Sequence, residues 1–598
     1  MSSAPHFFSN QEIAEMFAAV AAAYEVQGVS FFRRRAYETA AANIEHTTTA
    51  LFDLWKQDEL DAVAGLGEKF EEYIDELFTT GKIAHFEHVL QDFPAGFAAL
   101  LPLEWIGAKR AFTLAQEFQL TNPKTARDDL RKLAEAGEIR KLDRFGEGSE
   151  QKIIEALDRF AEQANQPKRM LLSEAEALVD EIMQYLRQSD AVLEAEALGS
   201  FRRHAPTIGD IDIAVKSEEP HAVMEHVRAF PGMQKILSTG DTTTMFKHTS
   251  GRQVDVKTEP PASWGSLLQH YTGSKAHNIA LRVRAKQQGL SISEHGIKDP
   301  AGVVHPKATE AEVYGALGLE FIPPELREGR QELELAAKQA VPELVELSDI
   351  QGDFHVHTDL DVATSHDIGS TPTLRLLERA SEKNYRYIGF SDHNPKLKDL
   401  TTADKKKILS KRRDTLLQAY ETFEKQASRR EGVSVPKMYI GLEIDIRPDG
   451  SLALEDELLD MLDYAIISVH SQFHQDIETA TQRILSALEH PKVKIWGHPT
   501  GRMIQERSGL EYDWDTLLPV LKQKDMWIEV NASPRRLDVP DDLIPKVVTA
   551  GVPLVINTDA HHEKHLDFMK YGVWMARRGG AEAKDVANAR ALKQLRLR

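Results

Sequence analysis

Two aspartates interrupt an apolar, strand-like run, Ile208-Gly-Asp-Ile-Asp-Ile-Ala-Val215. On a strand, Asp210 and Asp212 point to the same face, roughly 6.5–7 Å apart. Like charges at that distance repel, so the pair either faces water at a sheet edge or is bridged by a cation. A third carboxylate, Asp255, lies in a second strand-like run. Three carboxylates can hold two Mg²⁺ ions, which activate an attacking hydroxyl and stabilise a leaving pyrophosphate.

A short segment upstream of the aspartates has the residue types that bind phosphate. Gly199-Ser-Phe-Arg-Arg203 contains a glycine, which lets the backbone approach a ligand, and Ser and Arg donors for phosphate oxygens. The sequence therefore predicts a phosphate-binding site beside the metal-binding aspartates.

A second set of metal-type ligands lies in the last 250 residues. Histidines and carboxylates recur at or near the ends of successive strand-like runs, and in parallel α/β folds such ends meet at one edge. The residues are His355, His357, His393, Glu443, His470, His498, Asp559 and His561. Clustered imidazoles and carboxylates suit Mn²⁺ or Zn²⁺. Arg502, Arg535 and Arg536 follow the fifth and sixth runs and are either phosphate ligands or ordinary surface arginines.

The elements that must position these residues lie in three regions of the chain, each with its own sequence pattern. Residues 10 to about 165 show helical periodicity, interrupted by glycine turns, and residues 168–320 alternate between helix-like and strand-like runs. From Asp349, seven strand-like runs are separated by helical segments, which indicates parallel strands in a barrel or a doubly wound sheet. Residues 325–347 are charged, and their pattern predicts a helical connector.

Composition excludes several classes of protein. The chain has 598 residues, 42% of them hydrophobic, no cysteine and a formal net charge of -20. It has no apolar run long enough to span a membrane and no secretion signal, so we expect a cytoplasmic protein without disulfides or Cys-ligated zinc. Non-specific coating of nucleic acid is disfavoured by the charge. Arg33 to Arg35 and the basic run from Lys405 to Arg413 are either local DNA-binding patches or solvated helix faces.

The first set of motifs resembles family X DNA polymerases, in the order GSFRR, GDID, Asp255 and then Tyr271-Thr-Gly-Ser-Lys-Ala-His-Asn278-Ile-Ala-Leu-Arg282. The resemblance implies that the three aspartates are catalytic and bind Mg²⁺ or Mn²⁺. It also implies nucleotide-binding and DNA-binding roles for other matched residues. Those at the triphosphate, sugar or base are Gly199, Ser200, Arg203, Gly209, Tyr271, Gly273 and Ser274, and those at the minor groove are Asn278 and Arg282.

The N-terminal glycine turns resemble the helix-hairpin-helix motifs of the same family. Such a turn aims backbone N–H groups at a DNA phosphate without net positive charge. Gly65 and Gly67 form the first motif, and Gly107 belongs to the second, where Trp105 replaces the expected glycine. The family's lyase chemistry needs a Schiff-base lysine, but Tyr73 stands at the matching position. We therefore expect weak or absent lyase activity.

The C-terminal motifs resemble the polymerase-and-histidinol-phosphatase (PHP) domain, a distorted (β/α)7 barrel. The resemblance implies three Mn²⁺ or Zn²⁺ ions held by the eight residues above and a ninth ligand after the first strand. The loop Asp359 to Ser370 offers Asp367, which we prefer, or His366. Metals about 4 Å apart can activate water for attack on a phosphoester.

The resemblances together predict a multi-domain α+β and α/β protein. The expected order is a helix-hairpin-helix, lyase-like domain (1–88), helical fingers (89–166), a nucleotidyltransferase palm (167–262), a small thumb (263–324), a linker (325–348) and the PHP domain (349–598).

These domains imply a monomeric, nucleoid-associated DNA repair enzyme. Its partners would be dNTPs and gapped or nicked DNA, with no membrane. One site fills short gaps and the other degrades DNA 3′→5′, with abasic-site endonuclease or 3′-phosphatase action as further candidates. Two alternatives stay open: a small-molecule phosphatase with a secondary polymerase part, and a non-catalytic protein that binds DNA ends.

Overall fold

The chain divides into two compact units, Met1–Lys168 and Arg169–Arg598, each described here by itself. The computed structural model describes residues 8, 10–46, 51–52, 55, 60, 66–103, 105–165, 169–364, 366–396, 400–473, 475–595 and 597. Within those residues, no helix is long and apolar enough to cross a bilayer.

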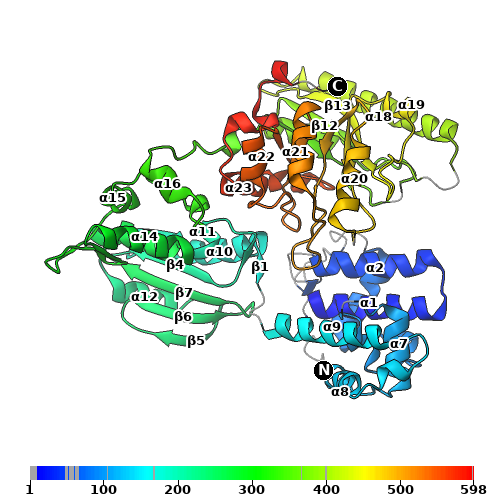
Figure 1. Cartoon of the computed structure of the whole chain (residues 1–598), viewed down its shortest axis with the longest axis horizontal. Coiled ribbons are helices and arrows are strands. Elements are labelled where there is room, and N and C mark those ends of the chain that lie inside the picture. Colours follow the sequence, from blue (N-terminus) through cyan, green and yellow to red (C-terminus); the bar gives the residue numbers. More distant parts are fainter. Residues whose placement is uncertain are drawn as a thin grey trace. The chain divides into compact units, whose positions relative to one another are not determined.

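Helices joined by turns, with no strand, make up the described residues of the first unit (Figure 1). Its helices are α1 (Asn10–Gln27), α2 (Phe31–His46), α4 (Glu68–Thr80), α5 (Ala84–Leu90), α6 (Phe97–Leu100), α7 (Ala108–Glu117), α8 (Ala126–Glu135) and α9 (Glu147–Asn165). Apolar residues at helical spacing meet in one core, where the rings of Phe17 and Phe86 pack edge to face at 4.8 Å.

The second unit begins with a mixed sheet, the predicted palm. Its strands lie in the order β2-β4-β7-β6-β5, and only β4 and β7 run parallel. Helices α10 and α12 cover it, together with the short α11 (Figure 1). The elements are β1 (Met170–Leu171), α10 (Leu172–Leu186), β2 (Glu194–Ala197), α11 (Gly199–Arg202), β3 (Thr207–Ile208), β4 (Ile211–Lys216), α12 (Pro220–Arg228), β5 (Met233–Thr239), β6 (Thr243–His248) and β7 (Gln253–Glu259).

A small helical and hairpin region, the predicted thumb, follows. It contains α13 (Trp264–Thr272), α14 (Lys275–Gln287), the strands β8 (Ser291–Ser293), β9 (Gly296–Lys298) and β10 (Val304–His305), and α15 (Glu310–Gly315).

The prediction that residues 325–347 form a helical connector is largely wrong. Residues 325–347 contain the end of the turn η4 (Pro324–Leu326) and α16 (Glu332–Ala337), and only one residue of η5 (Leu347–Asp349). Gly329 adopts a φ of 76°, which a right-handed helix does not allow, and Pro342 lacks the N–H that a helix needs. The charged pattern was helical in period, but these two residues interrupt it.

The seven predicted strands all form, and they pair in parallel in sequence order from β11 to β17. They are β11 (Gly352–Val356), β12 (Tyr387–Phe390), β13 (Lys437–Asp445), β14 (Tyr464–Ser468), β15 (Val493–Trp496), β16 (Trp527–Asn531) and β17 (Leu554–Asn557). A bridge between Val356 and Ala560 brings the first strand to the end of the last, so the barrel is nearly closed. The predicted fold class, including this (β/α)7 barrel, is confirmed.

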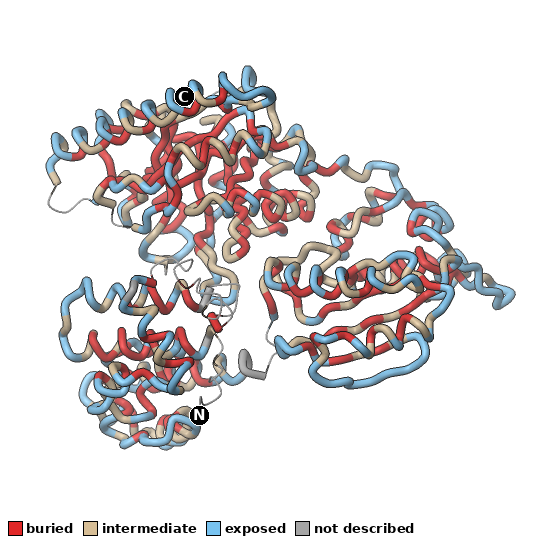
Figure 2. Tube along the Cα trace, turned by 180° about the vertical axis from the view of Figure 1, so that it is seen from behind, coloured by how far each residue is buried: buried red, intermediate tan, exposed pale blue. Residues whose placement is uncertain are grey.

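The barrel helices lie outside the strands (Figure 1). They are α17 (Thr373–Glu382), α18 (Thr402–Ala427), α19 (Asp456–Leu459), α20 (Ile477–Ala487), α21 (Trp514–Gln523), α22 (Ile544–Ala550), the turn η6 (Glu563–Phe568) and α23 (Met569–Arg578). Ala465 and Ile467 on β14 join the large outer core, whereas the alternate residues Tyr464 and Ile466 join a separate cluster with Trp527. Figure 2 shows the strands buried and the outer sides of the helices exposed. Burial on both faces explains why the strand sequences are almost continuously apolar.

Candidate active sites

Two of the three palm aspartates pair across the sheet. Asp212 on β4 and Asp255 on β7 are direct neighbours in the parallel register, and Asp210 lies just before β4 begins. Burial and the carboxylates of Asp210 and Asp255 raise the pKa of Asp212 to about 7. The three side chains therefore form one electrostatically coupled group, in which a bound cation would be stabilised.

Gly199 touches this group and cannot be larger. It opens α11 with a φ of 59°, and a Cβ atom there would lie 2.5 Å from Oδ2 of Asp212. Glycine is thus required both for its left-handed backbone and for the close approach. Ser200 is the next residue of the same helical turn. Gly209 lies instead beside Arg169, whose Nη1 would be 3.1 Å from an added Cβ.

Arg203 connects this turn with the thumb. Its Nη1 donates to the carbonyl of Thr272 at 2.6 Å, and its Nε donates to Oε1 of Glu328 at 3.0 Å. Gly273 follows with a φ of 67°, and a Cβ there would lie 3.2 Å from the Arg203 Nη1. The GSFRR and TGS segments, 69 residues apart between Arg203 and Thr272, are therefore adjacent.

Two thumb residues near this turn have defined partners. The Tyr271 hydroxyl accepts a hydrogen bond from Nζ of Lys257 at 2.6 Å, which fixes the ring against β7. Ser274 caps α14, because its side chain accepts from the backbone N–H of His277 at 3.2 Å.

Both polar groups of the Asn278 side-chain amide form hydrogen bonds with residues of α13. It accepts from Nε2 of Gln269 at 2.8 Å and donates to the His270 carbonyl at 2.7 Å. Arg282, one turn further along α14, is exposed and is the freer of the two predicted minor-groove residues.

In the first unit, the hairpin glycines precede helices. Gly67 and Gly107 are the N-cap residues of α4 and α7, while Gly65 lies outside the described residues. Trp105 has a φ of 67°, the left-handed conformation that favours the glycine expected there. Arg110 holds it, since its guanidinium lies 3.7 Å from the indole centroid and donates to the Trp105 carbonyl.

The position of the missing lyase lysine is occupied by a stacked ring. Tyr73 is buried and lies parallel to His85 with ring centroids 5.3 Å apart. The neighbouring Lys69 pairs with Glu72, and the hydrogen bond and charge of that glutamate raise the pKa of the lysine amine. Lys82 is also engaged in an ion pair. A protonated amine is a poor nucleophile, which disfavours Schiff-base chemistry at these lysines.

The barrel residues gather at the C-terminal ends of the strands into four overlapping groups. In each group, the candidate ligand atoms all lie within 4.8 Å of one another. The groups are His355, His357, Glu443 and Asp559; Glu443, His470 and His498; His357, His393 and His561; and His366, His393 and His470. All eight residues predicted from the strand ends are brought together. The three palm aspartates, also described, do not gather this tightly.

The donor atoms of this cluster fit divalent ions. Buried polar atoms normally have hydrogen-bond partners. Several here have none among the described residues: His355 Nε2, both ring nitrogens of His357, His393 Nδ1, Glu443 Oε2, His498 Nδ1 and His561 Nε2. Burial opposes the charge of Glu443, but His393, His355 and His470 outweigh it and hold its pKa well below the usual range. Imidazole nitrogens without hydrogen bonds, gathered around an ionised carboxylate, are a donor set for divalent metal ions.

Both candidates for the ninth ligand lie at the cluster. Asp367 places one carboxylate oxygen 3.4 Å from Nε2 of His393 and the other 3.3 Å from Nε2 of His561. His366 is within the ligand group of His393, but its Nε2 already faces Oδ1 of Asp445 at 2.9 Å.

Sequence reasoning missed two carboxylates that hold the cluster histidines. Oε1 of Glu529 lies 2.7 Å from Nδ1 of His355, and its Oε2 accepts from the backbone N–H of His498. Oδ1 of Asp445 lies 2.6 Å from Nδ1 of His470. Hydrogen-bonded carboxylates of this kind orient metal-ligating imidazoles. The sequence does contain an indication of this role for Glu529, because it is the only charged residue of its buried strand.

The arginines after the fifth and sixth strands differ in availability. Arg502 donates to the carbonyls of Arg536 and Leu537, so it stabilises the loops. Arg535 pairs with Glu506 at 2.8 Å. Arg536 lies at the cluster, with Nε 3.5 Å from Oδ2 of Asp559.

The basic run of the barrel is largely used within the protein. On α18, Lys405 pairs with Glu455 at 2.9 Å, and Arg412 pairs with the buried Asp392 at 2.6 Å. Arg413 donates to a main-chain carbonyl. Lys405, Arg412 and Arg413 of this run thus stabilise the barrel, whereas Lys406, Lys407 and Lys411 are exposed on the outer face of the helix.

The arginines of α2 also have acidic partners. Arg34 pairs with Glu25 and Glu38, and Arg35 pairs with Glu38.

Four family models match the chain in the order of these regions. They are a helix-hairpin-helix domain over residues 8–83, a DNA polymerase beta palm over 169–253, a DNA polymerase beta thumb over 267–328 and a PHP domain over 353–533.

Similar proteins cover either the whole chain or one of its parts. The DNA polymerase/3′-5′ exonuclease PolX of Bacillus subtilis is 33% identical over 590 residues, which are 98% of each chain. DNA polymerase lambda of Rattus norvegicus is 25% identical over 53% of this chain and 56% of its own. A probable phosphatase of Thermoanaerobacter is 28% identical over 35% of this chain and 78% of its own.

The full-length similarity, the palm and thumb geometry and the histidine cluster in the barrel agree. The chain belongs to the family X DNA polymerases of the bacterial type, which carry a C-terminal PHP domain.

Proposed function

We propose that the chain fills short gaps in DNA by template-directed addition of dNTPs to a 3′ end. The observation that carries this proposal is the register that pairs Asp212 with Asp255, with Gly199 pressed onto the same carboxylate. Asp210, Asp212 and Asp255 would bind Mg²⁺ or Mn²⁺. When bound, such ions neutralise the triphosphate and lower the pKa of the primer hydroxyl.

The surrounding residues would then hold the nucleotide and the DNA. In this proposal Gly199, Ser200, Arg203 and Gly209 bind the triphosphate, Tyr271, Gly273 and Ser274 line the sugar and base, and Asn278 and Arg282 face the minor groove. Arg203 suits its role because two of its nitrogens are anchored while Nη2 has no hydrogen-bond partner among the described residues. The hairpins at Gly65, Gly67 and Gly107 would bind backbone phosphates of gapped or nicked DNA. Because one chain builds all of these parts, we propose that it acts as a monomer.

We further propose that the barrel is a metal-dependent phosphodiesterase with 3′→5′ exonuclease activity. His355, His357, Glu443 and Asp559 would form one ion site, and Glu443, His470 and His498 a second. Asp367, His393 and His561 would form the third, because the two Asp367 oxygens face both of these histidines. Three Mn²⁺ or Zn²⁺ ions fit this donor set. Arg536 lies where it can bind the phosphate. The name of the Bacillus relative supports an exonuclease, and abasic-site or 3′-phosphate cleavage would use the same groups.

Hydrolysis of small phosphomonoesters is the second candidate for the barrel. The Thermoanaerobacter relative, which aligns with 35% of this chain, is named a probable phosphatase. Phosphate release from histidinol phosphate that exceeds nucleotide release from DNA would favour this alternative.

A single gapped duplex tests both sites. A 5′-labelled primer with dNTPs and Mn²⁺ should be extended, and without dNTPs it should be shortened. Asp212→Asn should abolish extension and retain shortening, and Glu443→Gln should do the reverse. Asp241→Asn, an exposed palm carboxylate, is the matched control and should change neither. Shortening that survives Glu443→Gln, in protein free of other nucleases, would exclude the cluster as the nuclease site.

A further inference from the structure

Arg578, the last residue of the barrel helix α23, reaches the palm. Its side chain is 5% exposed. Nη1 donates to the main-chain carbonyl of Arg203 at 2.5 Å and to Oε1 of Glu328 at 2.8 Å, while Nη2 donates to Oδ2 of Asp541 at 3.0 Å. A residue of the PHP barrel thus contacts both the backbone and the acidic partner of a proposed triphosphate ligand.

Glu328 is shared by two guanidinium groups. The same oxygen, Oε1, accepts from Nε of Arg203 at 3.0 Å and from Nη1 of Arg578. A carboxylate that pairs with one arginine cancels its charge. Here two carboxylates, Glu328 and Asp541, are shared among three arginines, Arg203, Arg578 and Arg330, so the set keeps one net positive charge. Because Arg578 competes for Glu328, that carboxylate neutralises less of the charge that Arg203 presents to a triphosphate.

The residue after Arg203 is fixed to the same helix. The His204 ring stacks on Trp574 of α23 with centroids 3.9 Å apart and planes 2° from parallel. Both the carbonyl of one residue and the ring of the next are held by α23, which limits the conformations of this turn. Orienting a phosphate ligand before the substrate arrives reduces the entropy lost on binding.

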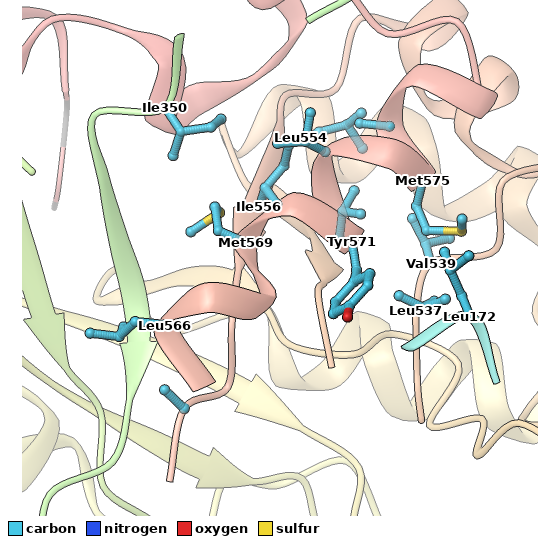
Figure 3. Close-up of a cluster of buried hydrophobic side chains, with 14 of the residues drawn as sticks. Leu172, Ile350, Leu537, Val539, Leu554, Ile556, Leu566, Met569, Tyr571 and Met575 are labelled. Atoms are coloured by element: carbon cyan, nitrogen blue, oxygen red, sulfur yellow. The ribbon is translucent and has the colours of Figure 1, made fainter. Parts of the chain in front are cut away.

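A packed interface supports these contacts. Figure 3 shows Leu172, at the start of the palm helix α10, among Leu537, Val539 and Met575 of the barrel, and all four belong to one buried cluster. Elsewhere on α23, Lys570 pairs with Glu176 of the palm at 2.6 Å. The palm and the barrel therefore share a core, and α23 has a defined position against the GSFRR turn.

We propose that the PHP barrel completes the nucleotide site of the polymerase, with Arg578 as a positioning residue that acts through Arg203 and Glu328. The inference rests on the proposed polymerase function. It assigns to the barrel a role in dNTP binding that is separate from its own metal cluster.

Steady-state single-nucleotide insertion on gapped DNA tests the proposal. Arg578→Gln should raise the KM for dNTP by about tenfold, the effect expected from losing one charge-assisted hydrogen bond, with a much smaller change in kcat. Exonuclease activity should be retained, because Asp541 keeps a second partner, Arg330, at 2.8 Å. Lys570→Ala breaks another ion pair between palm and α23 and should leave the KM unchanged.

The double variant Arg578→Gln/Glu328→Gln separates charge from scaffolding. Removing the carboxylate frees Arg203 again, so the double variant should recover a KM near that of the wild type. If loss of packing were the cause, the second substitution would make binding worse. Should Arg578→Gln unfold the protein, as thermal melting would reveal, Arg578→Lys tests the charge directly, because a lysine keeps the charge without the paired contacts. Its KM should stay near that of the wild type, and a tenfold rise would overturn the role assigned to the charge.

The outcomes distinguish failure of the proposed polymerase function from failure of the role proposed for Arg578. Wild-type protein that shortens DNA but never extends a primer would overturn the polymerase function itself. Wild-type extension with an unchanged KM in Arg578→Gln, or an equal rise in Lys570→Ala, would overturn only the role of Arg578.

Discussion

Nδ1 of His355 and Oε1 of Glu529 lie 2.7 Å apart, and both side chains are completely buried. The same oxygen accepts a hydrogen bond from the Asn557 amide at 2.9 Å. A carboxylate fixed in this way would hold the proton on Nδ1 when an ion binds, which leaves Nε2, beside Glu443 and Asp559, as the ligand atom. Glu529 and Asn557 of the barrel strands thus fix the orientation of the His355 ring.

The first prediction concerns Glu529→Gln, which keeps the shape of the side chain but removes its charge. Exonuclease activity should fall by about 10–100-fold, the usual range for a group that orients a metal ligand, while primer extension stays the same. Product lengths on a labelled gapped duplex measure both. Glu421→Gln, on the exposed side of α18, is the control. Unchanged exonuclease activity in Glu529→Gln would remove the proposed role.

The second prediction is that Gly199→Ala abolishes primer extension. The new Cβ would lie 2.5 Å from Oδ2 of Asp212, and the φ of 59° disfavours any L side chain. Gly315→Ala is a matched substitution in the thumb, since its Cβ meets nothing within 4 Å, and it should extend normally. Extension by Gly199→Ala at the wild-type rate would show that this turn does not carry the nucleotide site.

The third prediction concerns lyase chemistry. Wild-type protein should give little borohydride trapping with an abasic 5′-phosphate end, because Tyr73 replaces the amine and Glu72 keeps Lys69 protonated. Tyr73→Lys should increase trapping, since burial near His85 lowers the pKa of an introduced amine. Strong trapping by the wild type that disappears in Lys69→Ala or Lys82→Ala would contradict this expectation.

The fourth prediction concerns metal removal. Mn²⁺ added to chelator-treated protein should raise the melting temperature of the second unit, because ligand binding to the folded state stabilises it by about 2.7 kcal/mol at one hundred times Kd. The rise should be much smaller in Glu443→Gln, which disrupts two of the proposed ion sites. Equal rises in wild type and variant, measured by calorimetry, would mean that the ions bind elsewhere.

The strand positions could be predicted because the barrel strands are buried on both faces and therefore apolar throughout. The structure of the connector could not be predicted in the same way. Its charged residues follow a helical period, and only Gly329 and Pro342 interrupt that pattern. Trp105 is the opposite case, in which a changed residue did not change the backbone. It stands where a glycine is expected, yet it adopts the left-handed conformation, and Arg110 packs against its indole. Local patterns record average preferences, and single tertiary contacts override them.

The ligands at strand ends were predictable from position alone, since parallel strands bring their carboxyl ends together. Glu529 was not assigned because it belongs to the one strand that was not credited with a ligand. The role of Arg578 was beyond reach for a different reason. It lies 250 residues from Glu328, and nothing in either local sequence indicates that Arg578 donates a hydrogen bond to that carboxylate.

The internal pairing of Lys405 and Arg412, together with the net charge of -20, bears on how the protein responds to salt. Binding that neutralises many DNA phosphates releases condensed counterions, and it weakens steeply as ionic strength rises. Here Lys405 and Arg412 of the basic run already have acidic partners, and the hairpins offer main-chain amides. Fewer counterions would be released on binding than the number of basic residues suggests, so affinity for gapped DNA should depend less steeply on salt than that number predicts.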